Sequence, residues 1–531
     1  MKMKSSNIRS LGGFLLAGGL LLSSCTGEFE KWNINPDEAT KEDMTHDNLN
    51  TGSYFSQMER GVFVVGKDMG GEYQITQALE GDLYASYLAP TMKWNNDNRN
   101  DQYVLYMPWC NAPFNDAYER VMQPWLEIRK VSEDNSPALA MATVIKVLAM
   151  QRVTDTYGPI PYSKFGTAVQ VPYDSQEEVY NQMFKELADA INVLTAYANG
   201  SSDSYLADYD NVYSGNVVKW IRLANTLRLR MSMRISYVNE DKAKQEAQAA
   251  INNTYGLMQT ADDDAVLHQS TKLTFIHPLY EIGTSWDDEH MSATMECYLN
   301  GYADPRVAAY FLPATATSLY KGIRNGKSNI QKSQYQSNTS RMNYGAGTDM
   351  EWMHAAEAYF LMAEAKLRWD IGTMTARQYY EQGIRVSFAS AGVSGADSYL
   401  SNSERLPLST YVDPASNRST DVSSMLSMLP VAWDDAASAE TNLERIAIQK
   451  WIATYPDGQE AWSNMRRTGW PGWVRIETYR FQNEVRDGEM ISRLKFPTTE
   501  YTNNTDNTNA AASLLNGADA AGTRLWWDVK R

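Results

Sequence analysis

The sequence contains little cysteine. Only Cys25, Cys110 and Cys297 occur among the 531 residues, too few for a scaffold held together by disulfides. The segment Met107-Pro-Trp-Cys110 has no second cysteine, so it is not a dithiol redox motif. At most one disulfide, between Cys110 and Cys297, can form inside the domain, and the sequence alone does not decide whether these two residues pair.

The chain also lacks an excess of positive charge. It has 48 Lys and Arg residues against 64 Asp and Glu residues, a net charge of -16. Proteins that bind nucleic acid neutralise backbone phosphates with Lys and Arg, and this balance of charge argues against such a partner. An acidic surface suits a soluble domain outside the cell.

Sequence motifs of the common enzyme classes are missing. None of the five histidines lies in an HExxH pattern, and there is no G-x-S-x-G, Walker or dinucleotide-binding motif. Two acidic clusters remain, Asp262–Asp264 and Asp287–Glu289. A glycosidase needs two carboxyl groups that face one cleft at a defined separation, which neighbours in sequence rarely provide. We therefore expect no catalytic residues and no cofactor, with an extracytoplasmic hydrolase as the alternative.

The cluster Asp262, Asp263 and Asp264 allows a second interpretation. Calcium takes several carboxylate and carbonyl oxygens as ligands, so these residues are candidates for a structural calcium site. In a chain this acidic, a solvated acidic loop is the simpler alternative.

No hydrophobic run reaches the roughly 20 residues that a membrane-spanning helix needs. Near the N-terminus, three basic residues precede an apolar run of 12 residues, Leu11–Leu22, which is typical of a signal peptide. The residues "LSSC" that end at Cys25 resemble a bacterial lipobox. We expect residues 1–24 to be a lipoprotein signal peptide and residues 25–50 to be a lipidated N-terminus and tether, with Cys25 acylated. An ordinary secretory signal with an incidental cysteine is the alternative.

Helical patterns dominate residues 51–531, which we expect to form a single domain. Ser136–Gly158 is apolar on nearly every face and predicts a buried helix, and Ser175 with Glu178 forms a capping box at the start of the next. Glu351–Gly392 predicts an antiparallel helix pair that resembles a tetratricopeptide repeat unit. Gly383 within it indicates a close helix contact, because glycine costs about 1 kcal/mol there. The fold class is mostly α, with tetratricopeptide-like helix pairs as a scaffold and long loops and extra helices packed on it.

Aromatic residues are abundant and unevenly chosen, with 15 Trp and 32 Tyr against 13 Phe. Tyr and Trp combine a flat apolar face with a hydrogen-bonding edge, which suits the binding of sugars or peptides and also packing between helices. Trp451 and Trp462 lie at helical spacing among apolar residues, so we expect them in the core.

Three polar segments hold candidate ligand-binding residues. The first is Lys93–Asn100, where Trp94 is the platform on which a sugar ring stacks and Asn96 and Arg99 are hydrogen-bonding partners. In the alternative reading, Trp94 folds back into the core. The second candidate is Trp286 with Asp287. The third is Tyr344, near Tyr335 and Arg341.

Several motifs in order along the chain resemble the SusD/RagB family of outer-membrane nutrient-binding lipoproteins. The most specific segment is Gln449–Pro471, which contains "QKWIA", "EAW" and "RRTG". The other motifs are the lipobox, "NINP" at Asn33–Pro36, "DTYGPIPY" at Asp155–Tyr162, "AEAYFLMAEA" at Ala356–Ala365 and Arg493–Glu500.

This resemblance implies a binding protein that catalyses nothing. Family members sit over a SusC-like TonB-dependent transporter in the outer membrane, where they capture an oligosaccharide, or in some members a peptide, and deliver it. We therefore expect a protein that is anchored by lipid to the outer membrane and faces the outside. A structural surface lipoprotein that binds only another protein is a further alternative.

Overall fold

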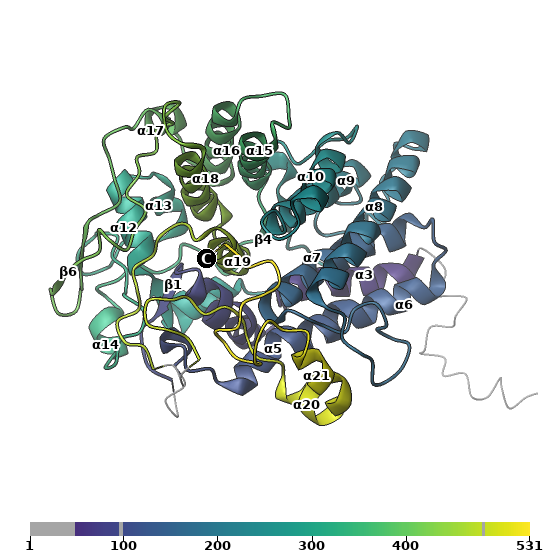
Figure 1. Ribbon diagram of the computed structural model, residues 1–531, viewed down its shortest axis with the longest axis horizontal. Helices are drawn as coiled ribbons and strands as arrows, with labels where there is room; N and C mark the ends of the chain where they lie inside the picture. Colours follow the sequence, from purple (N-terminus) through teal and green to yellow (C-terminus); the bar gives the residue numbers. More distant parts are fainter. Residues whose placement is uncertain (1–47, 95–98, 481–483, 531) are drawn as a thin grey trace, which may run out of the picture. The chain divides into compact units, whose positions relative to one another are not determined.

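The computed structural model describes residues 48–94, 99–480 and 484–530. The chain divides into two units, Met1–Asn50 and Thr51–Arg531, and the fold described here is that of the second (Figure 1). It is mostly α-helical, as the sequence predicts. The candidate anchor Cys25 lies outside the described residues. No helix in the described ranges is both long and apolar enough to cross a membrane.

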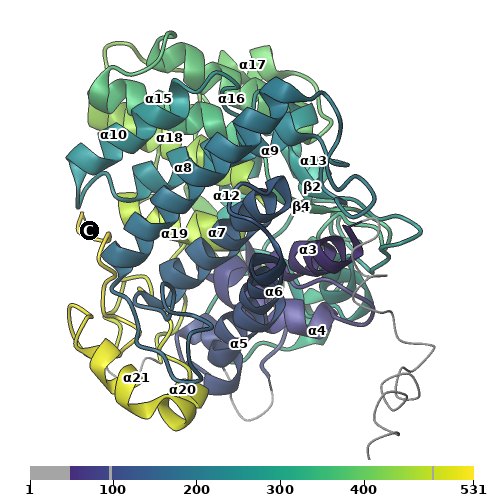
Figure 2. The ribbon, with the colours of Figure 1, turned by 90° about the vertical axis from the view of Figure 1, so that its right-hand side faces the viewer.

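Antiparallel helix pairs form the scaffold. Consecutive members pack against each other, and Figures 1 and 2 show them side by side. The helices of this scaffold are α7 (Pro137–Tyr157), α8 (Gln176–Gly200), α9 (Val217–Arg234), α10 (Glu240–Ile251), α15 (Ala356–Trp369), α16 (Ala376–Ser390), α18 (Ala439–Thr454) and α19 (Gly458–Thr468).

Local sequence signals account for the ends and the spacing of these helices. The capping box at the start of α8 is confirmed, because the Ser175 hydroxyl accepts from the Glu178 amide and the Glu178 carboxylate accepts from the Ser175 amide. The close contact inferred at Gly383 is also confirmed. A methyl group at that position would lie 3.0 Å from the ring of Phe360, so α15 and α16 approach more closely than a larger residue would allow.

Helix α7 is buried on all sides, as its apolar sequence predicts. Its lysine, Lys146, is accommodated by an ion pair with Glu186 at 2.8 Å, and its ammonium lies 3.8 Å from the centre of the Trp125 ring. Burial of a charge is tolerated where it is paired in this way.

Shorter elements and long connections cover the scaffold. The described ranges contain three two-stranded antiparallel sheets, in which β1 (Leu88–Pro90) pairs with β3 (Glu289–Met291), β2 (Ala265–Leu267) with β4 (Met350–Met353), and β5 (Thr410–Val412) with β6 (Ser419–Asp421). The other helices and helical turns are α3 (Leu49–Val62), α4 (Gly70–Tyr73), η2 (Gln74–Asp82), η4 (Asn100–Gln102), α5 (Met107–Ala117), η5 (Tyr118–Met122), α6 (Gln123–Val131), η6 (Ala261–Asp263), α11 (Pro278–Tyr280), η7 (Glu281–Ser285), α12 (Ala293–Tyr302), α13 (Arg306–Tyr310), α14 (Lys332–Tyr335), α17 (Ala396–Leu400), α20 (Thr498–Asn503) and α21 (Thr505–Ala512).

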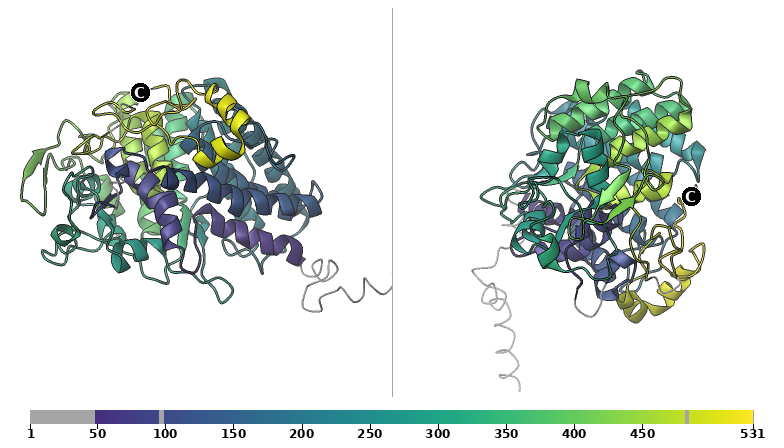
Figure 3. Two further views of the ribbon diagram at one scale, coloured as in Figure 1. Left: turned by 90° about the horizontal axis from the view of Figure 1, so that it is seen from below. Right: turned by 90° about the vertical axis from the view of Figure 1, so that its left-hand side faces the viewer.

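The C-terminal segment returns to the N-terminal part of the domain. Helix α20 lies beside α5 (Figure 3), and the Asn111 side-chain amide donates to the Thr498 hydroxyl at 2.8 Å. The first and last parts of the domain therefore form one folded body.

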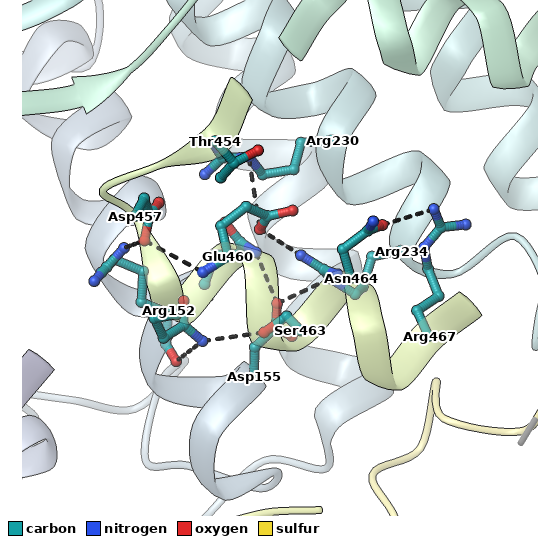
Figure 4. A network of polar contacts seen from close by, with 12 residues as sticks. Arg152, Asp155, Arg230, Arg234, Thr454, Asp457, Glu460, Ser463, Asn464 and Arg467 are labelled. Atoms are coloured by element: carbon teal, nitrogen blue, oxygen red, sulfur yellow. Dashed lines mark hydrogen bonds and ion pairs between the residues drawn. The ribbon is translucent and has the colours of Figure 1, made fainter. Parts of the chain in front are cut away.

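Helix α19 runs through the centre of the domain and carries a network of buried charges (Figure 4). Arg230 and Arg234 of α9 turn toward Glu460, and Arg234 also pairs with Asp155 of α7 at 3.1 Å. Burial opposes ionisation of Glu460, but these arginines lower its pKa below the usual range. The network links α7, α9 and α19 through paired charges.

The two tryptophans expected in the core are there. Trp451 and Trp462 are fully buried, and their indole N–H groups donate to the backbone carbonyls of Ala85 and Ile491.

Candidate ligand-binding site

Three partly exposed aromatic side chains gather where the chain leaves β1. Trp94 packs edge-to-face on Trp109, with ring centres 5.9 Å apart and an interplanar angle of 88°. Trp109 in turn meets Tyr106 at 5.1 Å and 84°. We call Trp94, Tyr106 and Trp109 the aromatic cluster. Each of the three is half-buried, so the cluster is fixed by the fold and still accessible to solvent.

Two of the three members lie outside the segments that the sequence predicts to bind a ligand. Tyr106 immediately precedes α5, and Trp109 lies in its first turn. The signal was present in the sequence, since a tyrosine and a tryptophan follow the Trp94 loop within fifteen residues. Asn96, the predicted amide partner of Trp94, lies outside the described residues.

Arg99, the third residue predicted to bind a ligand in the first segment, directly precedes η4. Its side chain is 1% exposed and forms a bidentate pair with Asp101, with both N–O distances at 2.8 Å. It also donates to the backbone carbonyl of Lys327, more than 200 residues away. The guanidinium therefore makes internal contacts that join residues 99–101 to the segment around Lys327.

Asn100 connects Tyr106 to Glu80, a buried residue of η2. Its side-chain amide donates to the Glu80 carboxyl group at 2.9 Å, while its side-chain oxygen accepts from the Tyr106 amide at 3.4 Å. Burial raises the pKa of Glu80 from near 4.5 to about 8, so Glu80 is largely protonated at neutral pH. Asn100 thus ties the position of Tyr106 to a buried carboxylic acid.

The segment from Trp473 to Arg480 lies against Gln102 and Tyr103. The Arg480 amide donates to the Gln102 carbonyl at 3.2 Å, and the rings of Tyr103 and Tyr479 meet edge-to-face at 5.9 Å. In the same segment, the Arg475 guanidinium lies 3.4 Å from the centre of the Trp473 ring. Gln102 and Tyr103, which precede Tyr106, are therefore supported from the C-terminal part of the chain as well.

The second predicted site, Trp286 with Asp287, is held mainly by internal contacts. One carboxylate oxygen of Asp287 lies 2.8 Å from the His290 ring nitrogen and accepts from Arg341 at 2.7 Å. Burial opposes ionisation of Asp287, but these two partners lower its pKa. Trp286 is half-buried, and its carbonyl accepts from Lys332 at 2.7 Å.

The third predicted residue, Tyr344, lies in a different environment from its sequence neighbours. Its ring stacks on His277, with centres 4.1 Å apart and an angle of 10°. Tyr335 instead contacts Asp413, and Arg341 pairs with Asp287. The structure does not bring these three residues together into one site.

The carboxylates of the candidate calcium cluster turn to separate partners. Asp263 pairs with Arg222 at 2.9 Å and accepts from the Gln259 amide, whereas Asp264 contacts His354 at 3.0 Å and accepts from the Ala355 amide. Asp262 is exposed. These groups do not converge on one point and do not fit a shared cation. Within the described ranges, no group of three or more His, Cys, Asp or Glu side chains is placed to hold a metal.

The structure also answers the question about the cysteines. Cys110 and Cys297 are both buried and free, so they do not form a disulfide.

Among the predicted residues, Trp94 joins Tyr106 and Trp109 in a group of accessible aromatic rings. Such rings can stack on the C–H face of a sugar or on an apolar peptide side chain, and their N–H and O–H edges can hydrogen-bond to it. The aromatic cluster has no nucleophile or acid–base pair built into it, so its geometry suits binding.

A model of the SusD-like family, described as SusD and RagB outer membrane lipoproteins, matches residues 31–528. The chain belongs to the SusD-like family. Members of this family are nutrient-binding lipoproteins and not enzymes, which agrees with the missing catalytic motifs.

Solved structures of other SusD-like proteins resemble this chain over nearly its whole length. A chitin-binding SusD homologue from Flavobacterium johnsoniae is 37% identical, with a TM-score of 0.85 over 91% of this chain and 99% of that one. A SusD homologue from Bacteroides uniformis is 36% identical, with a TM-score of 0.84 over 91% and 100%. A SusD-like protein from Bacteroides thetaiotaomicron is 31% identical, with a TM-score of 0.83 over 91% and 99%. A comparison with curated protein sequences gave no match.

Proposed function

We propose that this SusD-like protein binds an oligosaccharide through the aromatic cluster of Trp94, Tyr106 and Trp109 and delivers it to a SusC-like TonB-dependent transporter. The observation that carries the proposal is the contact between these three half-buried rings, of which Trp94 follows β1 and Tyr106 and Trp109 lie at the start of α5. An oligosaccharide presents flat C–H faces along its length, and neighbouring rings set nearly at right angles can contact two of its sugar units at once.

The related protein from Flavobacterium johnsoniae supports a glycan as the ligand, because it is described as chitin-binding and shares 37% of its residues with this chain. The sequence supports the location. With its signal peptide and the lipobox that ends at Cys25, the chain would be anchored to the outer membrane by acyl chains and would face the outside. A binding protein held there can pass its ligand to a transporter in the same membrane.

A peptide ligand is the second candidate within the same role, since aromatic rings bind apolar side chains as well as sugars. A retention screen of the unlipidated protein, from Thr26 onward, distinguishes a glycan ligand from a peptide ligand. Immobilised polysaccharides, mucin-type glycans and peptide mixtures would be tested with the wild type, Trp94→Ala, Trp109→Ala and a control, Trp369→Ala. Trp369 is also half-buried, but lies at the end of α15 and donates to Glu240 at 2.9 Å.

Retention on one class of glycan that is lost in Trp109→Ala and kept in Trp369→Ala supports the proposal. Retention of peptides alone replaces the oligosaccharide with a peptide. Retention that survives Trp109→Ala and Trp94→Ala removes the aromatic cluster from the binding site.

A further inference from the structure

A polar cavity of about 160 Å³ lies apart from the aromatic cluster. Its walls come from four segments: α13, residues 343–354, the end of α16, and residues 453–455 at the end of α18. None of the residues that line it belongs to the aromatic cluster or its loop. The volume is far above the roughly 10–15 Å³ that one water molecule requires, so a larger polar molecule fits.

Several buried polar atoms around this cavity have no hydrogen-bond partner among the described residues. They are the hydroxyl of Tyr455, the hydroxyl of Ser390 and one carboxylate oxygen of Glu351. The Tyr455 side chain is only 2% exposed. A buried polar group without a partner is costly, so three of them around one cavity point to a ligand that supplies the missing hydrogen bonds.

His277 adds a fourth such atom beside the cavity. Its Nδ1 accepts from the Leu279 amide at 3.2 Å, so its Nε2 carries the ring proton. That Nε2 has no hydrogen-bond partner and lies 3.8 Å from the Glu351 carboxylate, beyond hydrogen-bond distance. Of this pair, Glu351 lines the cavity, so its carboxylate can accept from a hydroxyl group there.

Aromatic rings form much of the remaining surface. Tyr344, whose ring is held on that of His277, lines the cavity, as do Tyr310 and Tyr455, whose centres are 4.7 Å apart. Tyrosine faces pack well against the C–H groups of a ring that also carries hydroxyls.

The charges at the cavity favour an uncharged ligand. Burial alone would lower the pKa of His354, but the Asp264 carboxylate raises it to about 9, so this side chain is a cation with its own partner. Glu351 has no lysine or arginine partner among the ion pairs of the described residues, and its carboxylate disfavours an anion. The neighbouring charges of Arg230 and Glu357 are paired with each other.

We propose that this cavity binds one uncharged polyhydroxylated ring, a single sugar unit or a polyol of that size, as a second site separate from the aromatic cluster. This inference goes beyond the proposed function, because a monosaccharide-sized cavity can act whether or not the aromatic cluster binds a glycan. The hydroxyls of the ring would meet Glu351, Ser390 and Tyr455, and its C–H face would lie on the tyrosines.

Saturation-transfer NMR of the protein with glucose, galactose, N-acetylglucosamine and myo-inositol tests the proposal. A ligand of this size binds with a Kd in the millimolar range. The first variant is Ala391→Trp, which fills the cavity from its half-buried rim. Its matched control is Ala389→Trp, two residues earlier on the exposed face of α16. Glu351→Gln tests the carboxylate without changing its size.

We expect at least one of these probes to bind, with at least a tenfold weaker Kd in Ala391→Trp and in Glu351→Gln and an unchanged Kd in Ala389→Trp and Trp109→Ala. No binding of any probe to the wild type overturns the proposal, as does binding that survives Ala391→Trp. Loss of binding in Trp109→Ala assigns the sugar to the aromatic cluster and also overturns it. Thermal unfolding of each variant shows that the fold is retained.

Glycan retention by the Ala391→Trp protein shows whether the ring in the cavity is a free molecule or part of the captured glycan. Unchanged retention indicates a free sugar or polyol as the occupant, and weaker retention indicates the terminal unit of the captured glycan. Because the aromatic cluster is intact in this variant, failure of the second site is distinguishable from failure of the proposed function.

Discussion

Arg467 of α19 and Glu364 of α15 form a buried bidentate ion pair, with both N–O distances at 2.7 Å. Burial opposes ionisation of Glu364, but Arg467 and Arg368 lower its pKa far below the usual range. This pair ties one tetratricopeptide-like helix pair to the central helix, and the "RRTG" motif supplies its arginine.

Removing one partner of this pair should destabilise the domain strongly. Glu364→Gln leaves the Arg467 charge buried without its counter-ion, which costs about 3–5 kcal/mol. The midpoint of urea denaturation should fall accordingly. The control Glu381→Gln removes a partner of the exposed Arg377 on α16 and should change stability by no more than about 1 kcal/mol. Equal effects of the two substitutions would contradict this role for the pair.

Glu80 should make the domain less stable as pH rises through neutrality. Its pKa is about 8 in the folded state against about 4.5 when exposed, so the folded state holds the proton more tightly. This contribution to stability is complete below about pH 4.5, decreases as pH rises, and is lost above about pH 8.

Glu80→Gln removes this titration, so the variant should lose less stability than the wild type between about pH 5 and about pH 8. Thermal unfolding across that range measures the difference. Glu133→Gln, at an exposed position, should leave the pH profile unchanged. A Glu80→Gln profile parallel to that of the wild type would show that Glu80 is ionised in the fold.

Gly458 marks a close contact between α19 and η2. A methyl group there would lie 2.4 Å from the Cα of Asp82, and backbone atoms cannot move aside as a side chain can. Gly458→Ala should therefore lower stability by about 1–3 kcal/mol. Gly200→Ala, at the end of α8 with nothing within 4 Å, should be neutral or slightly stabilising. Differential scanning calorimetry measures the stability of both variants. A Gly458→Ala protein that is more stable than Gly200→Ala would contradict a close contact at Gly458.

The lipid anchor can be tested by where the protein is found. Cys25→Ser removes the thiol that would be acylated, so the protein should leave the membrane fraction while keeping its ligand affinity. Cell fractionation shows where each protein is found, and incorporation of labelled palmitate shows whether it is acylated. A Cys25→Ser protein that stays in the membrane fraction would show that another feature anchors it.

Local signals in the sequence are sufficient to predict much of the scaffold. The Ser175 capping box, the buried Trp451 and the close contact at Gly383 each depend on a few neighbouring residues or on helical spacing. The family resemblance then orders these helices into one fold.

The sites are harder to predict because distant segments build them. Arg99 looks like a ligand-binding residue in the sequence, but its partners include a backbone carbonyl at Lys327. Tyr344 meets His277, and not its own sequence neighbours. The cavity near Tyr455 is lined by four separate segments. No periodicity or motif in the sequence predicts that these segments lie together.

The central claim is that the aromatic cluster binds a glycan, and a calorimetric titration of the retained oligosaccharide tests it most directly. The wild type, Trp94→Ala, Trp109→Ala and Trp369→Ala proteins would be titrated side by side. We expect at least about tenfold weaker binding in each of the first two variants and wild-type affinity in Trp369→Ala. Wild-type affinity in both Trp94→Ala and Trp109→Ala would contradict it.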